Sequence, residues 1–131
     1  MSNSVLIVDD EPEILETTKW AFEMAGFQVH TAASAEEALP QARDRRPDVL
    51  LIDYKLPQMN GLELLGKVRE WIPNAVAIII TGLTHQSENL EEASRQLGAA
   101  GFLHKPLQLE RVLKLVRERV RPSTGLGRTE A

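Results

Sequence analysis

Three of the five aspartates in the chain lie where two apolar segments end. Asp9 and Asp10 follow the apolar run Val5–Val8. Asp53 follows a second apolar run, Val49–Ile52. Turns and helix starts favour aspartate, which explains the first pair without any function but does not explain Asp53, since a carboxylate that closes an apolar run has no helix to cap there. Carboxylates held together repel one another unless a cation is present, so we expect a site for a hard divalent ion, Mg2+ or Mn2+.

A hydroxyl and an ammonium group follow two further apolar segments. Thr81 comes after Ala75–Ile80, and Lys105 comes shortly after Gly101–Leu103. Taken singly, a helix cap explains Thr81 and a solvated charge explains Lys105 equally well. Beside a metal ion, however, a lysine offsets the repulsion between a carboxylate and phosphate oxygens, so that the carboxylate can attack a phosphoryl group. Asp53 is the candidate nucleophile because it lies centrally among these segment ends.

Alternating strands and helices must position these side chains. Apolar runs of strand length alternate with stretches of helical period along the chain. The predicted strands are Val5–Val8, Phe27–Ala32, Val49–Ile52, Ala75–Ile80 and Gly101–Leu103. The predicted helices are Glu13–Ala25, one after the Ser34 cap, Gly61–Trp71, one from Ser87 to Gly98, and one that starts near Leu107 or Gln108. Regular alternation of this kind is typical of an α/β fold, a parallel sheet with helices on both faces.

The composition of the strands predicts their order in the sheet. The first, third and fourth strands are continuous apolar runs, as expected for strands that are covered on both faces. The second strand is more polar and the fifth is short, which places them at the edges. The flavodoxin-like order 2-1-3-4-5 meets both conditions with right-handed crossovers, and its ligand-binding switch point lies between the first and third strands.

Three residues on the predicted helices carry local expectations. Pro40 falls about six residues into the second helix, where it removes a hydrogen bond, so we expect a kink or a late start. Trp20 and Trp71 lie on helices without an aromatic stripe around them. We expect both to be core or half-buried packing residues.

Composition excludes several classes of function. The absence of cysteine excludes a disulfide scaffold, a thiolate zinc site and cysteine catalysis. The net charge of −4 argues against binding to nucleic acid or to an anionic membrane by this chain alone. The longest apolar run is far shorter than the ~20 residues of a spanning helix, and no signal peptide is visible, so we expect a soluble, cytoplasmic protein. We expect one domain over residues 1–121, and a flexible tail or the start of a linker over 122–131.

The combination of motifs resembles the receiver domain of two-component response regulators, which has a CheY-like three-layer fold. The resemblance covers residues 4 to 121, and its marks are Asp9-Asp10, Asp53 with Pro57 and Gly61, Thr81-Gly82, and Phe102 before Lys105-Pro106. It implies that a histidine kinase or phosphotransfer protein donates a phosphoryl group to Asp53. It further implies that Asp10 and Asp53 ligate Mg2+ directly, that Asp9 does so largely through water, and that the main-chain carbonyl of Lys55 completes the protein's ligands.

The resemblance also implies a conformational switch. Thr81 and Lys105 would bind the phosphoryl oxygens, and movement of Thr81 would let Phe102 turn inward. The fourth helix, fifth strand and fifth helix would then present a changed surface to an unknown effector or to a second copy of the chain. Without any switching role, Phe102 is equally explained as a half-buried aromatic on an edge strand. Such a domain would assist its own phosphoryl transfer and dephosphorylation without being a turnover enzyme.

Two other functions suit the same fold. An electron carrier would bind flavin mononucleotide at the switch point, but Asp9, Asp10 and Glu11 would repel its phosphate group unless a metal ion intervened. A phosphoester hydrolase that works through an aspartyl phosphate also uses carboxylates and Mg2+. The motif typical of such hydrolases has a second acid two residues after the nucleophile. This sequence has Lys55 at that position.

Overall fold

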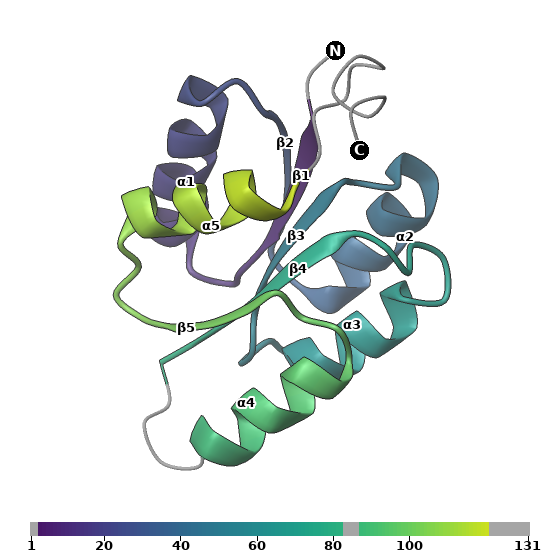
Figure 1. Ribbon diagram of the computed structural model, residues 1–131. Coiled ribbons are helices and arrows are strands. Elements are labelled where there is room, and N and C mark those ends of the chain that lie inside the picture. Colours follow the sequence, from purple (N-terminus) through teal and green to yellow (C-terminus); the bar gives the residue numbers. More distant parts are fainter. Residues whose placement is uncertain (1–2, 83–86, 121–131) are drawn as a thin grey trace, which may run out of the picture.

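The computed structural model describes residues 3–82 and 87–120, which form a five-stranded parallel sheet with helices on both faces (Figure 1). The strands are β1 (Ser4–Val8), β2 (Gln28–Ala32), β3 (Val49–Asp53), β4 (Val76–Thr81) and β5 (Gly101–His104). The helices are α1 (Pro12–Met24), α2 (Ala35–Arg45), α3 (Gly61–Val68), α4 (Ser87–Gln96) and α5 (Leu109–Arg119). The expected tail, residues 122–131, lies outside the described residues.

The strand order is β2-β1-β3-β4-β5, which confirms the predicted fold class and topology. All four strand pairs are parallel. The register aligns Val8 with Ile52, Asp53 with Ile80, and Thr81 with His104. The carboxyl ends of β1, β3, β4 and β5 therefore meet at one edge of the sheet.

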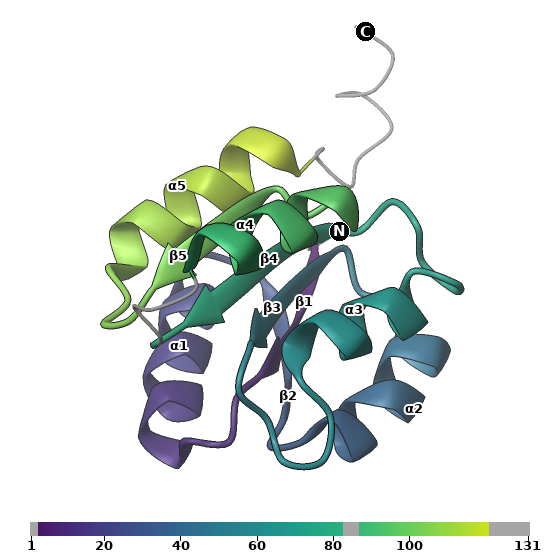
Figure 2. The ribbon, with the colours of Figure 1, turned by 90° about the horizontal axis from the view of Figure 1, so that it is seen from below.

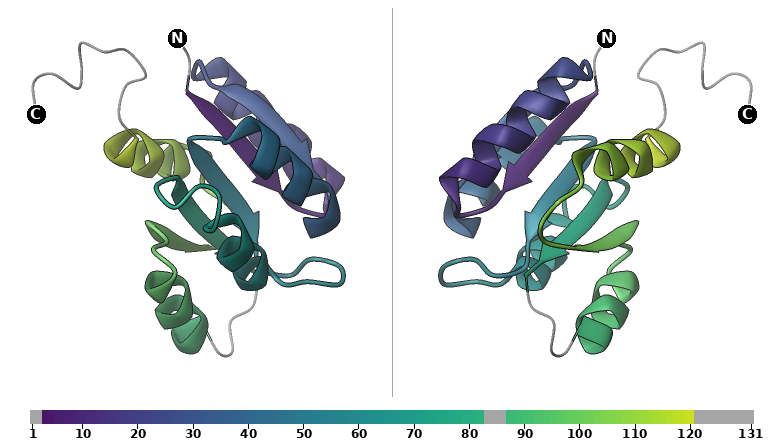
Figure 3. Two further views of the ribbon diagram at one scale, coloured as in Figure 1. Left: turned by 90° about the vertical axis from the view of Figure 1, so that its right-hand side faces the viewer. Right: turned by 90° about the vertical axis from the view of Figure 1, so that its left-hand side faces the viewer.

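Two apolar layers separate the sheet from its helices. Helices α1 and α5 cover one face, and α2, α3 and α4 cover the other (Figures 2 and 3). Alternate residues of the central strands enter opposite layers, so Leu50 packs towards α2 and α3 while Leu51 packs towards α1 and α5. Strands that are buried on both faces need continuous apolar sequence, which explains why β1, β3 and β4 were recognisable as apolar runs.

Helix α2 starts at its predicted cap despite the internal proline. The Ser34 hydroxyl accepts a hydrogen bond of 3.1 Å from the backbone N–H of Glu37. The helix then runs from Ala35 through Pro40, so the expectation of a late start is wrong. Pro40 is exposed while Ala38 and Ala42 are buried, so the buried face of the helix avoids the proline ring.

Two further expectations on the helices differ from the structure. Helix α3 ends at Val68 instead of Trp71, because the chain continues in a tighter turn in which the Trp71 N–H donates to the Val68 carbonyl. Trp71 is half-buried as expected, but Trp20 is 63% exposed, so the packing role predicted for it is wrong. Thr18 and Phe22 occupy the buried face of α1, and Trp20 lies between them in sequence, on the far side of the helix. No helix in the described part of the chain is long and apolar enough to cross a membrane.

Candidate functional site

The parallel register brings the predicted site residues to one edge of the sheet. Asp53 ends β3, Asp9 follows β1, and Lys105 follows β5. The Lys105 Nζ lies 3.3 Å from an oxygen of Asp9 and 3.3 Å from an oxygen of Asp53. The Lys105 ammonium, which follows the edge strand β5, thus contacts carboxylates at the ends of the central strands β1 and β3.

The three aspartates form a compact cluster of oxygen atoms. One carboxylate oxygen from each of Asp9, Asp10 and Asp53 lies within 4.8 Å of the others. Asp9 and Asp53 are buried, with 2% and 3% of their surface exposed, whereas Asp10 is exposed. The site therefore has two carboxylates fixed in the protein interior and one that faces solvent.

The loop after β3 holds Asp53 in place by close backbone packing. The N–H of Gly61 donates to the carbonyl of Tyr54 at 2.7 Å, so the start of α3 folds back against the end of β3. A Cβ atom at Gly61 would clash with the Asp53 carbonyl oxygen, since the two atoms would lie only 2.5 Å apart. The close approach therefore requires glycine. Asn60 caps α3 and forms reciprocal hydrogen bonds with Glu63, which fixes the point at which the helix begins.

Burial disfavours the charge on both inner aspartates. It raises the pKa of Asp53 to about 6, and the negative charge of Asp9 contributes in the same direction. Hydrogen bonds from Lys105 and from the backbone N–H of Lys55 oppose this rise only in part. Burial also raises the pKa of Asp9, although its carboxylate accepts a 2.9 Å hydrogen bond from the N–H of Glu11. The cluster thus carries more negative charge than its surroundings compensate.

Lys105 has a third carboxylate partner that the sequence analysis missed. Its Nζ donates to an oxygen of Glu11 at 2.5 Å, closer than to either aspartate. Burial lowers the pKa of Lys105, but the carboxylates of Glu11, Asp53 and Asp9 outweigh that effect and raise it. Glu11 directly follows the two aspartates at the end of β1, and this adjacency was the available signal for a fourth acid at the site.

The remaining predicted residues are Thr81, Lys55 and Phe102, and their surroundings differ. Thr81 is buried at the end of β4, and its carbonyl accepts a 2.8 Å hydrogen bond from the N–H of Lys105. Lys55 is exposed, and its backbone N–H donates a hydrogen bond to Asp53. Phe102 lies away from the cluster, half-buried on β5, where its ring contacts the His104 ring edge to face at 5.5 Å.

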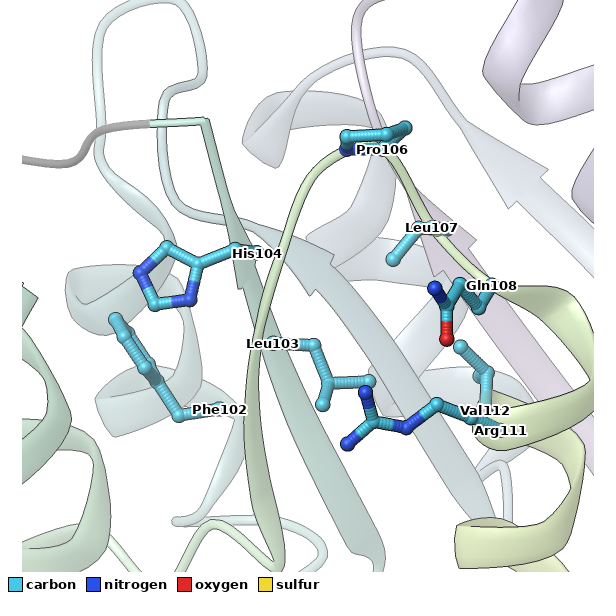
Figure 4. Close-up of a pocket in the computed structure, with 8 residues that line it drawn as sticks. All are labelled: Phe102, Leu103, His104, Pro106, Leu107, Gln108, Arg111 and Val112. Atoms are coloured by element: carbon cyan, nitrogen blue, oxygen red, sulfur yellow. The ribbon is translucent and has the colours of Figure 1, made fainter.

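One hollow lies over the acidic cluster, and another lies over β5 and the start of α5. A groove of about 560 Å³ opens over the acidic cluster, lined by Asp10, Glu11, Asp53, Lys55, Leu56, Pro57, Gly82 and Lys105. A second hollow of about 240 Å³ lies over β5 and the start of α5, as Figure 4 shows, with Phe102 and His104 on one side of the strand and Leu107, Gln108 and Arg111 on the other. No acidic residue lines the second hollow, so only the first has the chemistry of a cation site.

The donor set of the first groove fits Mg2+ or Mn2+. Such ions prefer hard oxygen ligands, and one or two carboxylates with water are usual for Mg2+. Asp9, Asp10 and Asp53 supply oxygens, and Lys105 is the one cation that the described residues place against Asp9 and Asp53. A divalent ion would offset the excess negative charge that raises the pKa of Asp53.

Comparison with known proteins identifies the family of this chain. Residues 5–117 match the family model described as the response regulator receiver domain. The chain is 33% identical over 126 residues to the transcriptional regulatory protein KdpE of Mycobacterium tuberculosis, covering 96% of this chain and 54% of that protein. The chain therefore spans about half the length of such curated relatives.

Solved structures show the same fold. A CheY-like response regulator receiver domain protein from Methanospirillum hungatei superposes with a TM-score of 0.85, 30% identity and full coverage of both chains. A response regulator from Burkholderia pseudomallei, solved with a phosphorylated aspartic acid, calcium ion and citrate, gives a TM-score of 0.81 and 25% identity over 88% of this chain and 66% of that one. The strand order, the acidic cluster at its switch point and these matches lead to one conclusion: the chain belongs to the receiver domain family of two-component response regulators.

Proposed function

We propose that this chain is a phosphorylation-controlled signalling module whose phosphoacceptor is Asp53. One observation carries the proposal: the buried Asp53 carboxylate lies in a groove beside two further aspartates and 3.3 Å from the Lys105 ammonium. Positive charge beside a buried carboxylate stabilises its ionised form and offsets its repulsion from the oxygens of an incoming phosphoryl group. The phosphorylated aspartic acid of the Burkholderia relative supports the same reading.

The transfer reaction uses the Asp53 carboxylate as nucleophile. An Asp53 oxygen attacks the phosphorus of a phosphohistidine on a sensor histidine kinase or phosphotransfer protein. A P–O bond forms, the P–N bond breaks, and the imidazole leaves and takes up a proton. Lys105 offsets the repulsion between the carboxylate and the phosphoryl oxygens, and it is held in reach by Glu11 and Asp9.

Asp9, Asp10 and Asp53, with the main-chain carbonyl of Lys55, would hold the divalent ion. When bound, Mg2+ or Mn2+ supplies positive charge that orients the phosphoryl group and stabilises charge in the transition state. Asp10 is the exposed member of the cluster, so it faces the side from which solvent and the donor approach. The calcium ion in the Burkholderia relative is consistent with a cation at such a site.

Thr81 and Phe102 would connect the phosphoryl group to the surface formed by α4, β5 and α5. Thr81 is level with His104 in the parallel register, and its carbonyl accepts from Lys105, so movement of Thr81 acts on the end of β5. Phe102 is half-buried against the core and contacts His104, and in the proposed switch it would exchange this contact for a more buried position. A surface that differs between the two states can bind an effector, or a second copy, in one state only.

Relatives of this family imply a histidine kinase partner and a downstream effector. We propose that residues 1–121 form the receiver unit, that 122–131 form a tail or begin a linker, and that this unit alone does not bind nucleic acid. The chain would act as a phosphoacceptor that assists its own dephosphorylation and not as an enzyme with steady turnover.

Intact-mass analysis with a small phosphodonor tests the proposal. The protein is incubated with acetyl phosphate and Mg2+, and we expect one added phosphoryl group on the wild type and none on Asp53→Asn. The matched control is Asp48→Asn, because Asp48 is an aspartate at the opposite end of β3 and its variant should gain the phosphoryl group normally. Equal labelling of wild type and Asp53→Asn would refute the proposal.

The same sample separates the two alternative functions. A phosphoester hydrolase would release phosphate steadily from a monoester such as p-nitrophenyl phosphate, and we expect no sustained release. A flavin carrier would be yellow as purified or would bind added flavin mononucleotide, and we expect neither. Either result would replace the signalling function with the corresponding alternative.

A further inference from the structure

Lys105 has one ion-pair partner outside the aspartate cluster, and that partner is the closest of its three. Its Nζ lies 2.5 Å from an oxygen of Glu11, against 3.3 Å from an oxygen of Asp9 and 3.3 Å from an oxygen of Asp53. An ammonium group has three N–H donors, so three carboxylates engage its whole hydrogen-bonding capacity. A phosphoryl group that binds Lys105 must therefore loosen at least one of these contacts.

Of the three contacts, the one with Glu11 is the easiest to release. Asp9 and Asp53 are buried, and the Asp9 carboxylate also accepts a 2.9 Å hydrogen bond from the backbone N–H of Glu11. The Glu11 side chain is 57% exposed and does not cap α1, and its carboxylate has no other hydrogen bond or ion pair among the described residues. A released Glu11 carboxylate is hydrated by solvent, whereas a buried carboxylate that lost Lys105 would lose a counter-charge in the protein interior.

A phosphoryl group on Asp53 would enter the space that Glu11 borders. Glu11, Asp53 and Lys105 line the same groove of about 560 Å³. The new group carries a charge of about −2, and its oxygens lie beyond the Asp53 carboxylate that Lys105 contacts. Two anions, the phosphoryl group and the Glu11 carboxylate, would then compete for one ammonium group, and they would also repel each other.

We propose that Glu11 competes with the phosphoryl group for Lys105: it binds the ammonium in the unphosphorylated protein and releases it when a phosphoryl group is bound. This role rests on the proposed function, since it takes Asp53 as the phosphoacceptor and Lys105 as a ligand of the phosphoryl oxygens. Asp9, which is buried, still holds the ammonium in reach of Asp53 after the release. Glu11 is thus a positioning residue that lowers the affinity of the groove for a phosphoryl group and takes no part in the transfer itself.

Removal of the Glu11 charge should strengthen phosphoryl binding. Glu11→Gln keeps the length of the side chain and one oxygen acceptor, but it loses the ion pair with Lys105 and the repulsion of the phosphoryl group. Because an ion pair with an exposed partner contributes little, we expect the affinity to rise by about three- to tenfold. Structural damage at the site would weaken binding, so the direction of the change distinguishes the proposed role from a merely structural one.

Beryllofluoride is the probe for this affinity, because it adds to a carboxylate oxygen with the tetrahedral geometry of a phosphoryl group. Its dissociation constant is measured by isothermal titration calorimetry at saturating Mg2+, so that an effect of Glu11 on metal binding does not contribute. We expect tighter binding by Glu11→Gln than by the wild type. With acetyl phosphate well below saturation, the initial rate at which Asp53 gains a phosphoryl group, followed by intact mass, should rise by a similar factor.

Two further variants separate competition for Lys105 from a general change of charge. Glu13→Gln makes the same charge change in the first turn of α1, where Glu13 is exposed and has no ion pair with another described residue. Its affinity for beryllofluoride should stay within about twofold of the wild type. Glu11→Asp keeps the charge but shortens the side chain by one methylene group, which weakens its contact with the Nζ of Lys105. Its affinity should lie between those of the wild type and Glu11→Gln.

The results that would overturn the proposal are distinct from failure of the phosphoacceptor function. Glu11→Gln binding no tighter than the wild type would overturn it, and so would an equal gain in Glu13→Gln. A gain in Glu11→Gln with none in Glu11→Asp would show repulsion through space in place of competition for Lys105, and would also overturn it. A wild type that gains no phosphoryl group at Asp53, by contrast, would refute the phosphoacceptor function itself.

Discussion

Two partly buried cations lie at opposite ends of the sheet and have different kinds of partner. Lys105, at the carboxyl end, lies against the carboxylates of Asp9, Glu11 and Asp53. Arg69, after the end of α3, donates five hydrogen bonds of 2.7 to 3.4 Å to backbone carbonyls alone. Those acceptors are the carbonyls of Ile72, Pro73, Ala75, Leu97 and Gly98, which lie before β4 and after α4.

The difference separates a cation with neutral, fixed partners from one surrounded by titratable acids. Backbone carbonyls are neutral and do not titrate, so Arg69 holds three chain segments in a fixed arrangement. Burial lowers the pKa of Arg69. The carboxylates around Lys105 exceed it in number, and the pKa of Asp53 rises to about 6 as a consequence of burial and of that excess charge. The Arg69 end is satisfied without a ligand, whereas the excess negative charge at the Lys105 end would be offset by a bound cation.

The largest effect is expected from removal of Arg69. Arg69→Met leaves five carbonyls without their donor and should reduce the free energy of unfolding by about 2–4 kcal/mol, measured by urea denaturation. The matched control is Arg46→Met, which removes an exposed arginine with a single hydrogen bond to the Trp71 carbonyl. We expect about 1 kcal/mol or less for this control. Equal losses in the two variants would show that the carbonyl cluster around Arg69 has no special role.

A smaller effect, of opposite sign, is expected at Asp53. Its pKa is about 6 in the folded protein and 3.8 in an ordinary environment, so the folded state binds the proton more tightly than the unfolded chain. Stability from this group is therefore present at low pH and is lost as the pH rises through 6. Without divalent ions, Asp53→Asn should be more stable than the wild type by about 2–3 kcal/mol at pH 8, and the gain should vanish near pH 4.

The control for this prediction is Asp44→Asn. Asp44 is exposed, and a hydrogen bond from Arg43 lowers its pKa, so removal of its charge should not stabilise the protein at high pH. Urea denaturation of the three proteins between pH 4 and pH 8 gives the comparison. A difference between Asp53→Asn and wild type that is constant with pH would contradict the raised pKa.

The smallest effect is expected from the metal ion itself. At pH 7.5 an ion that binds only the folded protein, at about tenfold its dissociation constant, should add about 1.4 kcal/mol of stability, seen as a higher melting temperature. At pH 5 protons compete for Asp53 and the gain should shrink. Asp10→Asn and Asp53→Asn should lose the response, and sodium chloride at matched ionic strength should not reproduce it. An equal response in Asp10→Asn would exclude that carboxylate as a ligand.

Much of the fold followed from patterns that are local in the sequence. Alternation of apolar runs with helical periods predicted the parallel sheet, and the polar content of Phe27–Ala32 predicted that β2 would be an edge strand, both of which are confirmed. Errors arose where tertiary contacts act. Position 20 is apolar yet faces solvent, and α3 ends early because the chain continues in a tighter turn after Val68. Neither outcome is encoded in the composition of a short window.

The sequence by itself determined which chemical groups end which strands, because a parallel sheet with right-handed crossovers delivers all strand ends to one edge. That rule was enough to collect Asp9, Asp53, Thr81 and Lys105. Only the tertiary structure decided which carboxylate lies closest to the ammonium of Lys105. That carboxylate belongs to Glu11, although 94 residues separate the two in the chain. Such choices depend on side-chain geometry and burial, which set hydrogen-bond distances and pKa values but leave no periodic trace in the sequence.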